Sequence, residues 1–170
     1  MSDPIDPITP DLLSPQAIAV LKFDADNAYR DLVVKTRGDD EVAAMLRNLS
    51  AANLLESGDS SNPLLAVAIG AIWLWHDFLD EAHKISQDIE RPEGSWLHAI
   101  VHRREGDFSN SKYWYARCAS LTNPGDLIDA AAAVHDRPGD PRYATAVAKQ
   151  RTEWRALFKH CIRYARPERQ

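Results

Sequence analysis

The sequence predicts an all-α protein, a compact array of about seven or eight helices. Apolar residues recur at intervals of three and four along successive segments, which is typical of amphipathic helices. The ten prolines and seven glycines cluster between these segments, where they would start or end helices. No segment shows the two-residue alternation of a half-buried strand. A length of 170 residues fits one domain.

The N-terminal part divides into a tail and a pair of helices. Residues 1–13 are acidic and proline-spaced, and we expect a flexible N-terminal tail there, followed by a single helical domain over residues 14–166. Ser14-Pro15 is a cap-then-proline signal that opens a helix extending to Arg37-Gly38. A second helix should follow, so that flanking helices occupy residues 15–56.

The rest of the chain repeats the same signals. Asn62-Pro63 opens a helix through Trp75 that is apolar almost all round, so we expect it to be the most enclosed helix. Further helices are expected over residues 79–89, 96–104 and 127–134. Another, capped by Ser109 or Asp107, should run through Cys118, and a long last one opens at Asp140-Pro141. Cys118 and Cys161 lie far apart and are expected to be free thiols.

Two segments in the centre look alike, Ala71–His83 and Val101–Trp114. Asp77-Phe78 aligns with Asp107-Phe108, and each unit is predicted to be a helix, a tight turn and a second helix. In both, a small residue near the start of the second helix lets the two helices approach closely. The pattern resembles tetratricopeptide-like helical hairpins over residues 64–119, although the period of about 30 residues is shorter than their usual one. The flanking helices 15–56 and 125–165 would then cap the ends of this array.

A second resemblance rests on three sequence segments: LWHDFLDEAHKISQDI (Leu74–Ile89), GSWLHAIVHRREGDFSNSKYWYARC (Gly94–Cys118) and EWRALFKHCIRYA (Glu153–Ala165). They are similar to a family of uncharacterised bacterial and fungal helical proteins with tetratricopeptide-like hairpins. That resemblance implies a helical fold. It implies no activity, because none is known for the family. Residues 120–150 have no counterpart in it.

Histidines and carboxylates form the best candidate for chemistry. His98, His102 and Glu105 share one face of a helix at i, i+4 and i+7, and His76, Asp80 and His83 have the same spacing. Imidazole and carboxylate ligands suit zinc, iron or manganese. The candidate catalytic residues are His76, His98, His102 and Glu105, and the candidate metal ligands are His98, His102 and Glu105. No cofactor is predicted, because helical histidine pairs also occur where they only make hydrogen bonds. A divalent metal stays open as the alternative.

A second set of residues is predicted to bind a ligand. Arg104 lies on the apolar stripe of its helix, so it should either pair with a carboxylate such as Asp77 or hold an anionic ligand with help from Lys112. Tryptophans of the repeat region should either fill the core or line a groove. The candidate ligand-binding residues are Asp77, Arg104, Lys112, Trp75 and Trp114.

Several classes of function are disfavoured. Residues 1–90 are acidic and residues 91–170 basic, but the basic residues are spread singly along helices, so we expect no nucleic-acid partner. The longest apolar run, Pro63–Trp75, is too short to span a bilayer, so we expect no membrane partner. The N-terminal residues have neither the basic segment nor the apolar segment of a secretory signal, so we expect a cytoplasmic protein. No phosphate-binding loop, dinucleotide-binding glycine pattern or nucleophile elbow is present.

These observations favour a tetratricopeptide-like binding or scaffold module over an enzyme. It would recognise a peptide, a protein or a small ligand in a groove near the central hairpins. The alternative is a small metal-assisted or acid–base hydrolase that uses His76, His98, His102 and Glu105. A purely structural or self-associating protein is a third alternative, and the oligomeric state does not follow from the sequence.

Overall fold

The computed structural model describes residues 10–57 and 60–166. Within these ranges there are eight α-helices, one 3₁₀ helix and no strand, so the predicted all-α class is confirmed. The helices are η1 (Pro10–Leu12), α1 (Pro15–Lys22), α2 (Asp40–Arg47), α3 (Pro63–Trp75), α4 (Leu79–Gln87), α5 (Pro92–Glu105), α6 (Phe108–Arg117), α7 (Leu127–Val134) and α8 (Pro141–Tyr164).

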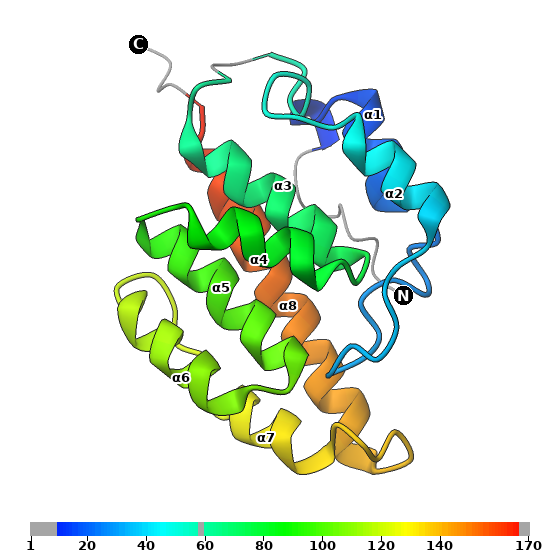
Figure 1. Ribbon diagram of the computed structural model, residues 1–170, viewed down its shortest axis with the longest axis vertical. Coiled ribbons are helices and arrows are strands. Elements are labelled where there is room, and N and C mark those ends of the chain that lie inside the picture. The colour runs from blue at the N-terminus through cyan, green and yellow to red at the C-terminus, as the bar shows by residue number, and fades with distance from the viewer. Residues whose placement is uncertain (1–9, 58–59, 167–170) are drawn as a thin grey trace.

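Helices α3 to α6 follow one another as a layered series, each packed on the next (Figure 1). The longest helix, α8, runs behind this series against α3 and α5, and α7 packs against both α6 and α8. Helices α1 and α2 pack together at one end. Helix α3 has ten of its thirteen residues buried, but α5 has eleven of fourteen, so α3 is not the most enclosed helix as predicted. The molecule is therefore a compact array built around α3 and α5.

Aromatic side chains join α3 to α8. The rings of Trp75 and Trp154 lie 4.6 Å apart between centroids, and Phe158 stacks on Trp154 at 5.1 Å. The indole nitrogen of Trp154 donates a hydrogen bond of 2.7 Å to the carbonyl of Ala71. The rings are fully buried and contribute apolar burial to the core, and the hydrogen bond from the indole of Trp154 adds specificity.

The predicted N-terminal tail lies partly outside the described residues, since residues 1–9 are not described. The remainder of it belongs to the folded domain. Residues Pro10–Leu12 form η1, and Leu13 is buried and pairs with Leu55 as an isolated bridge. The backbone of Ser14 donates to Leu54 and that of Glu56 donates to Leu12, each at 3.0 Å.

The first two helices are shorter than predicted. Helix α1 ends at Lys22 rather than near Arg37, and α2 ends at Arg47. Beyond α1, the carbonyls of residues 28, 29 and 31 accept hydrogen bonds from side chains of α5 and α8 instead of from helical amides. Tyr29 takes a positive φ of 55° and stacks on Trp75. Tertiary contacts thus replace a helix that the local pattern favours.

Most predicted helix starts are confirmed by their caps. The side chains of Ser14, Asn62 and Asp140 each accept a hydrogen bond from a backbone amide of the first turn, with proline at the next position. Asp107 caps α6 in the same way, without a proline. Helix α5 begins at Pro92, one turn earlier than the predicted start after Ser95.

The two central turns have the same backbone, but they correspond at an offset of 29 residues. Asp77 and Gly106 both adopt the left-handed conformation, with φ of 66° and 87°. The next amide in each turn, that of Phe78 and of Asp107, donates to the carbonyl five residues back. The Asp-Phe alignment is therefore wrong by one residue, because backbone conformation and not residue identity defines the equivalence. The structure has helix–turn–helix pairs here, and their assignment as tetratricopeptide-like repeats remains a prediction.

None of the helices described is both long and apolar enough to cross a bilayer. Cys118 and Cys161 are free and buried, as predicted.

Candidate functional site

Three histidines from two helices meet beside α6. His83 comes from α4, and His98 and His102 lie one turn apart on α5. One ring nitrogen from each lies within 4.8 Å of those of the other two. The Nε2 atoms of His83 and His98 are 3.0 Å apart, and the rings of His98 and His102 stack at 4.7 Å. We call His83, His98 and His102 the histidine cluster.

Glu105 and Asn110 fix the ring of His102. Nδ1 of His102 lies 2.9 Å from a carboxylate oxygen of Glu105, one turn further along α5. Since a carboxylate oxygen accepts hydrogen bonds, Nδ1 carries the hydrogen and donates this hydrogen bond to Glu105. Nε2 then has a free lone pair, which accepts from the side-chain amide of Asn110 at 3.3 Å. This tautomer turns the lone pair of His102 away from Glu105.

Burial keeps His98 neutral. Only 5% of His98 is exposed, and the indole of Trp114 stacks on its ring at a centroid distance of 4.0 Å. Burial, together with the neighbouring His83 and His102, lowers the pKa of His98 to about 4. Its Nδ1 is buried and has no hydrogen-bond partner among the residues that the structure describes. At neutral pH the ring therefore carries no charge and holds a lone pair.

His76 does not belong to this cluster. It is buried beside α1, where its Nε2 donates to the carbonyl of Val20 at 2.8 Å. The structure thus brings together His98, His102 and Glu105 of the predicted catalytic set and adds His83 in place of His76. The spacing of His76, Asp80 and His83 contained the signal for this site, but only packing selects the member that faces α5.

Arg104 and Asp77 form an internal link. Arg104 is fully buried and donates to a carboxylate oxygen of Asp77 at 2.8 Å and to the carbonyls of Leu74 and Asp31 at 3.0 Å. Its guanidinium also lies 4.0 Å from the ring centroid of Tyr29. These contacts correspond to the structural alternative for Arg104, in which it pairs with Asp77.

The other predicted ligand-binding residues are separated. Trp75 is fully buried in the core, and exposed Lys112 pairs with Asp129 at 2.7 Å. Trp114 is half-buried and lines a groove of about 690 Å³ at the central hairpins. Arg91, Arg117 and Glu90 also line this groove, so it carries mixed charge.

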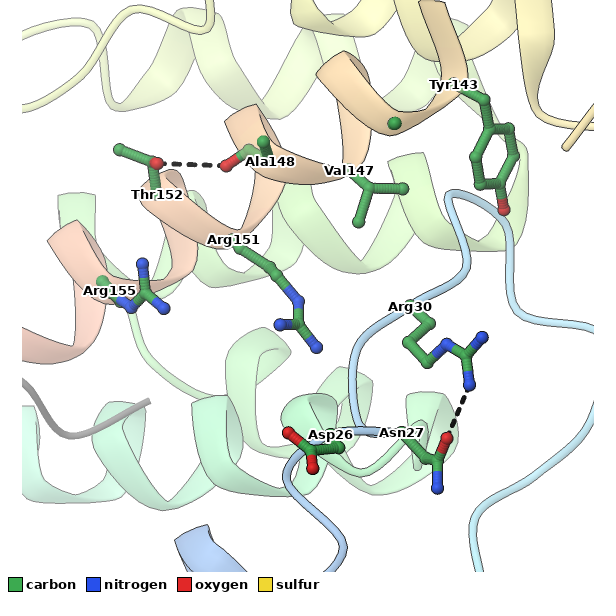
Figure 2. Close-up of a pocket in the computed structure, with 10 residues that line it drawn as sticks. Asp26, Asn27, Arg30, Tyr143, Val147, Ala148, Arg151, Thr152 and Arg155 are labelled. Carbon is green, nitrogen blue, oxygen red and sulfur yellow. Dashed lines mark hydrogen bonds between the residues drawn. The ribbon is translucent and has the colours of Figure 1, made fainter. Parts of the chain in front are cut away.

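A larger cavity, of about 780 Å³, lies between α8 and the segment that follows α1 (Figure 2). We call it the arginine pocket. Its lining includes three arginines and one carboxylate, Arg30, Arg151, Arg155 and Asp26. Figure 2 shows Arg151 reaching from α8 toward the segment that carries Asp26 and Asn27. An apolar wall from the first half of α8 completes it, made by Tyr143, Ala144, Val147 and Ala148.

The sequence alone does not predict this pocket. Its pattern places the arginines of α8 among singly spread basic residues and Arg30 within a helix. The four-residue spacing of Tyr143, Val147, Arg151 and Arg155 was the available signal for one shared face. The opposite side of the pocket is formed by the segment after α1, which lines it only because helix α1 ends at Lys22.

Comparison with models of protein families, with curated proteins and with solved structures gave no match.

Proposed function

We propose that this protein is a binding module for a small organic anion, which it holds in the arginine pocket. The observation that carries the proposal is the convergence of Arg30, Arg151 and Arg155 on one cavity, whose lining within the described part of the chain holds one carboxylate, that of Asp26.

Charge favours an anionic ligand. Burial, and then the neighbouring guanidiniums of Arg155 and Arg30, lower the pKa of Arg151, whereas the carboxylate of Asp26 raises it. A bound anion would act in the same direction as Asp26 and stabilise the positive charges. Guanidinium groups bind carboxylates and phosphates through paired, charge-assisted hydrogen bonds. Among the described residues, the groove at the central hairpins is lined by two arginines and a glutamate, so it is the weaker candidate.

Size and lining favour a small molecule with an apolar body. A volume of about 780 Å³ lies within the range of small-molecule sites. Tyr143 and Val147 offer an apolar surface beside the arginines, so a ligand with a charged head and an apolar body would satisfy both parts. From the sequence we expected a peptide, a protein or a small ligand in a groove near the central hairpins. The proposed ligand is a small molecule, and the proposed site lies at α8 instead.

The pocket is also prepared for binding. Arg151 donates to the carbonyls of Ala28 and Tyr29, and its guanidinium lies 5.2 Å from the ring centroid of Trp75. Arg30 donates to Asn27 at 2.5 Å (Figure 2). Because these contacts hold the side chains in place, less conformational entropy is lost when a ligand binds.

Titration with 1-anilinonaphthalene-8-sulfonate, an aromatic anion of suitable size, tests this function. We expect one site per chain, competition by inorganic phosphate and weakening by salt. The Arg30→Gln/Arg155→Gln variant should bind at least about 10-fold more weakly, since a hydrogen bond to a charged group contributes about 1.5–3 kcal/mol.

Lys149→Gln/Lys159→Gln is the matched control, because it also removes two positive charges, both from α8 outside the lining of the pocket. It should bind the dye like the unmodified protein. Equal affinity of the Arg30→Gln/Arg155→Gln variant and the unmodified protein would show that the arginines do not hold the anion.

A further inference from the structure

We propose that the histidine cluster is a binding site for a divalent transition-metal ion, with zinc as the best match. The site uses His83, His98 and His102 as ligands. It shares no residue with the arginine pocket, so each of the two proposals can be tested independently of the other.

The spacing of the ring nitrogens fits a tetrahedral ion. Zinc–nitrogen bonds of about 2.0–2.1 Å place two tetrahedral ligands about 3.3 Å apart. The Nε2 atoms of His83 and His98 are already 3.0 Å apart, and one nitrogen of every member lies within 4.8 Å of the others. A change of up to about 1.5 Å in the separations between these nitrogens would therefore complete the ligand set. Half-buried His83 has room for such a movement.

The protonation states suit a metal. Only one proton can lie between the two Nε2 atoms of His83 and His98, so at least one lone pair there points toward the other ring. In His102 the nitrogen left for a metal is Nε2, because Nδ1 is bonded to Glu105, and metal binding would replace the contact of Nε2 with Asn110.

Glu105 supports the site from behind. It accepts from Nδ1 of His102 at 2.9 Å, which is the carboxylate–histidine–metal arrangement that orients ligands in many zinc sites. We assign Glu105 as a positioning residue. The sequence predicted it as a candidate metal ligand, so this proposal departs from that prediction. The stacked ring of Trp114 restricts the movement of His98.

The ligand type selects the class of metal. Three imidazoles favour zinc, cobalt, nickel or copper over magnesium and calcium, which prefer oxygen ligands. Three protein ligands leave a fourth position for water. A metal-assisted hydrolase, the alternative that the sequence raised, would use such a site, but binding of the ion does not require catalysis.

Titration of the metal-free protein with cobalt provides the direct test. We expect one cobalt ion per chain with the intense visible absorption of tetrahedral coordination, and displacement by equimolar zinc. X-ray absorption of the zinc-loaded protein should show three nitrogen ligands at about 2.0–2.1 Å. A weak octahedral spectrum, or the absence of cobalt and zinc binding at micromolar concentrations, would overturn the proposal.

Variants locate the site on these residues. His83→Gln and His102→Gln should abolish the tetrahedral spectrum, whereas His135→Gln, which changes a histidine outside the cluster, should leave it intact. Glu105→Gln keeps all three ligands and alters an exposed residue, so the fold should be preserved. It should weaken cobalt binding about 10- to 100-fold. Circular dichroism checks folding. Unchanged cobalt affinity in the folded histidine variants or in Glu105→Gln would contradict the assignment.

Discussion

His76 and His83 lie on either side of the turn before α4, and they differ in burial and in their contacts. His76 is buried against α1 with its Nε2 bonded to Val20, whereas half-buried His83 faces His98. Two residues of the same type at i and i+7 thus have a structural and a candidate functional role. The difference arises because the turn at Asp77 redirects the chain between them.

The environment of His76 makes the stability of the protein depend on pH. Burial lowers the pKa of His76 below its usual 6.5, although Val20 and the carboxylates of Asp77 and Asp24 oppose the shift. Below about pH 6.5 the unfolded chain therefore binds more protons at this residue than the folded chain does. The resulting stability is present above pH 6.5 and is lost as the pH falls.

We expect His76→Gln, which can still donate to Val20 but does not titrate, to reduce the loss of unfolding free energy between pH 7 and pH 5. Urea unfolding at several pH values measures this, with His135→Gln as the control. Parallel profiles for His76→Gln and the unmodified protein would show that His76 does not contribute.

At the scale of elements, the two central turns show how one backbone is reached by different residues. Gly106 takes the left-handed conformation without steric cost, and Asp77 takes it while its carboxylate pairs with Arg104. A side chain at residue 77 is therefore needed for the link to Arg104. None is needed at residue 106, where the nearest heavy atom to an added Cβ would be on Val33 at 3.5 Å.

Gly106→Ala should lower the free energy of unfolding by about 1–2 kcal/mol, because alanine disfavours the left-handed conformation. Gly106→Asn should cost less, since asparagine tolerates that conformation. Thermal or urea unfolding of the two variants gives the comparison, and an equal cost for both would point to crowding at Val33 instead of backbone strain.

At the scale of the whole molecule, two adjacent arginines connect elements that are distant in the sequence. Arg104 joins α5 to the turn after α3 and to the segment after α1. Arg103 points the other way, where it pairs with Glu153 of α8 at 2.6 Å and donates to Tyr115 of α6 at 2.6 Å. Tyr115 in turn donates to Glu153. Both arginines are fully buried, so their charges depend on these partners.

Glu153→Gln should therefore destabilise the protein by about 3–5 kcal/mol, because Arg103 would remain buried and charged without its counterion. The Arg103→Met/Glu153→Leu variant should be more stable than Glu153→Gln, since it leaves no buried charge unpaired at this position. Urea unfolding of both variants tests this. A larger cost for the double variant would mean that the pair contributes a net stabilisation that apolar packing does not replace.

Local chemistry in the sequence determined the helical class and most helix starts. Ser14-Pro15, Asn62-Pro63 and Asp140-Pro141 act within one turn of backbone, so their effect can be predicted without the rest of the chain. The same holds for the shared face of His98 and His102, which helix geometry alone places together.

Only the tertiary structure decided where the first helix stops and which residues face these histidines. The carbonyls of residues 28, 29 and 31 bond to side chains from α5 and α8, which are more than 70 residues away along the chain. The choice of His83 over His76 and the convergence of Arg30 on α8 depend in the same way on distant helices. Local periodicity contains no information about such contacts, because their free energy arises only when the distant segments meet.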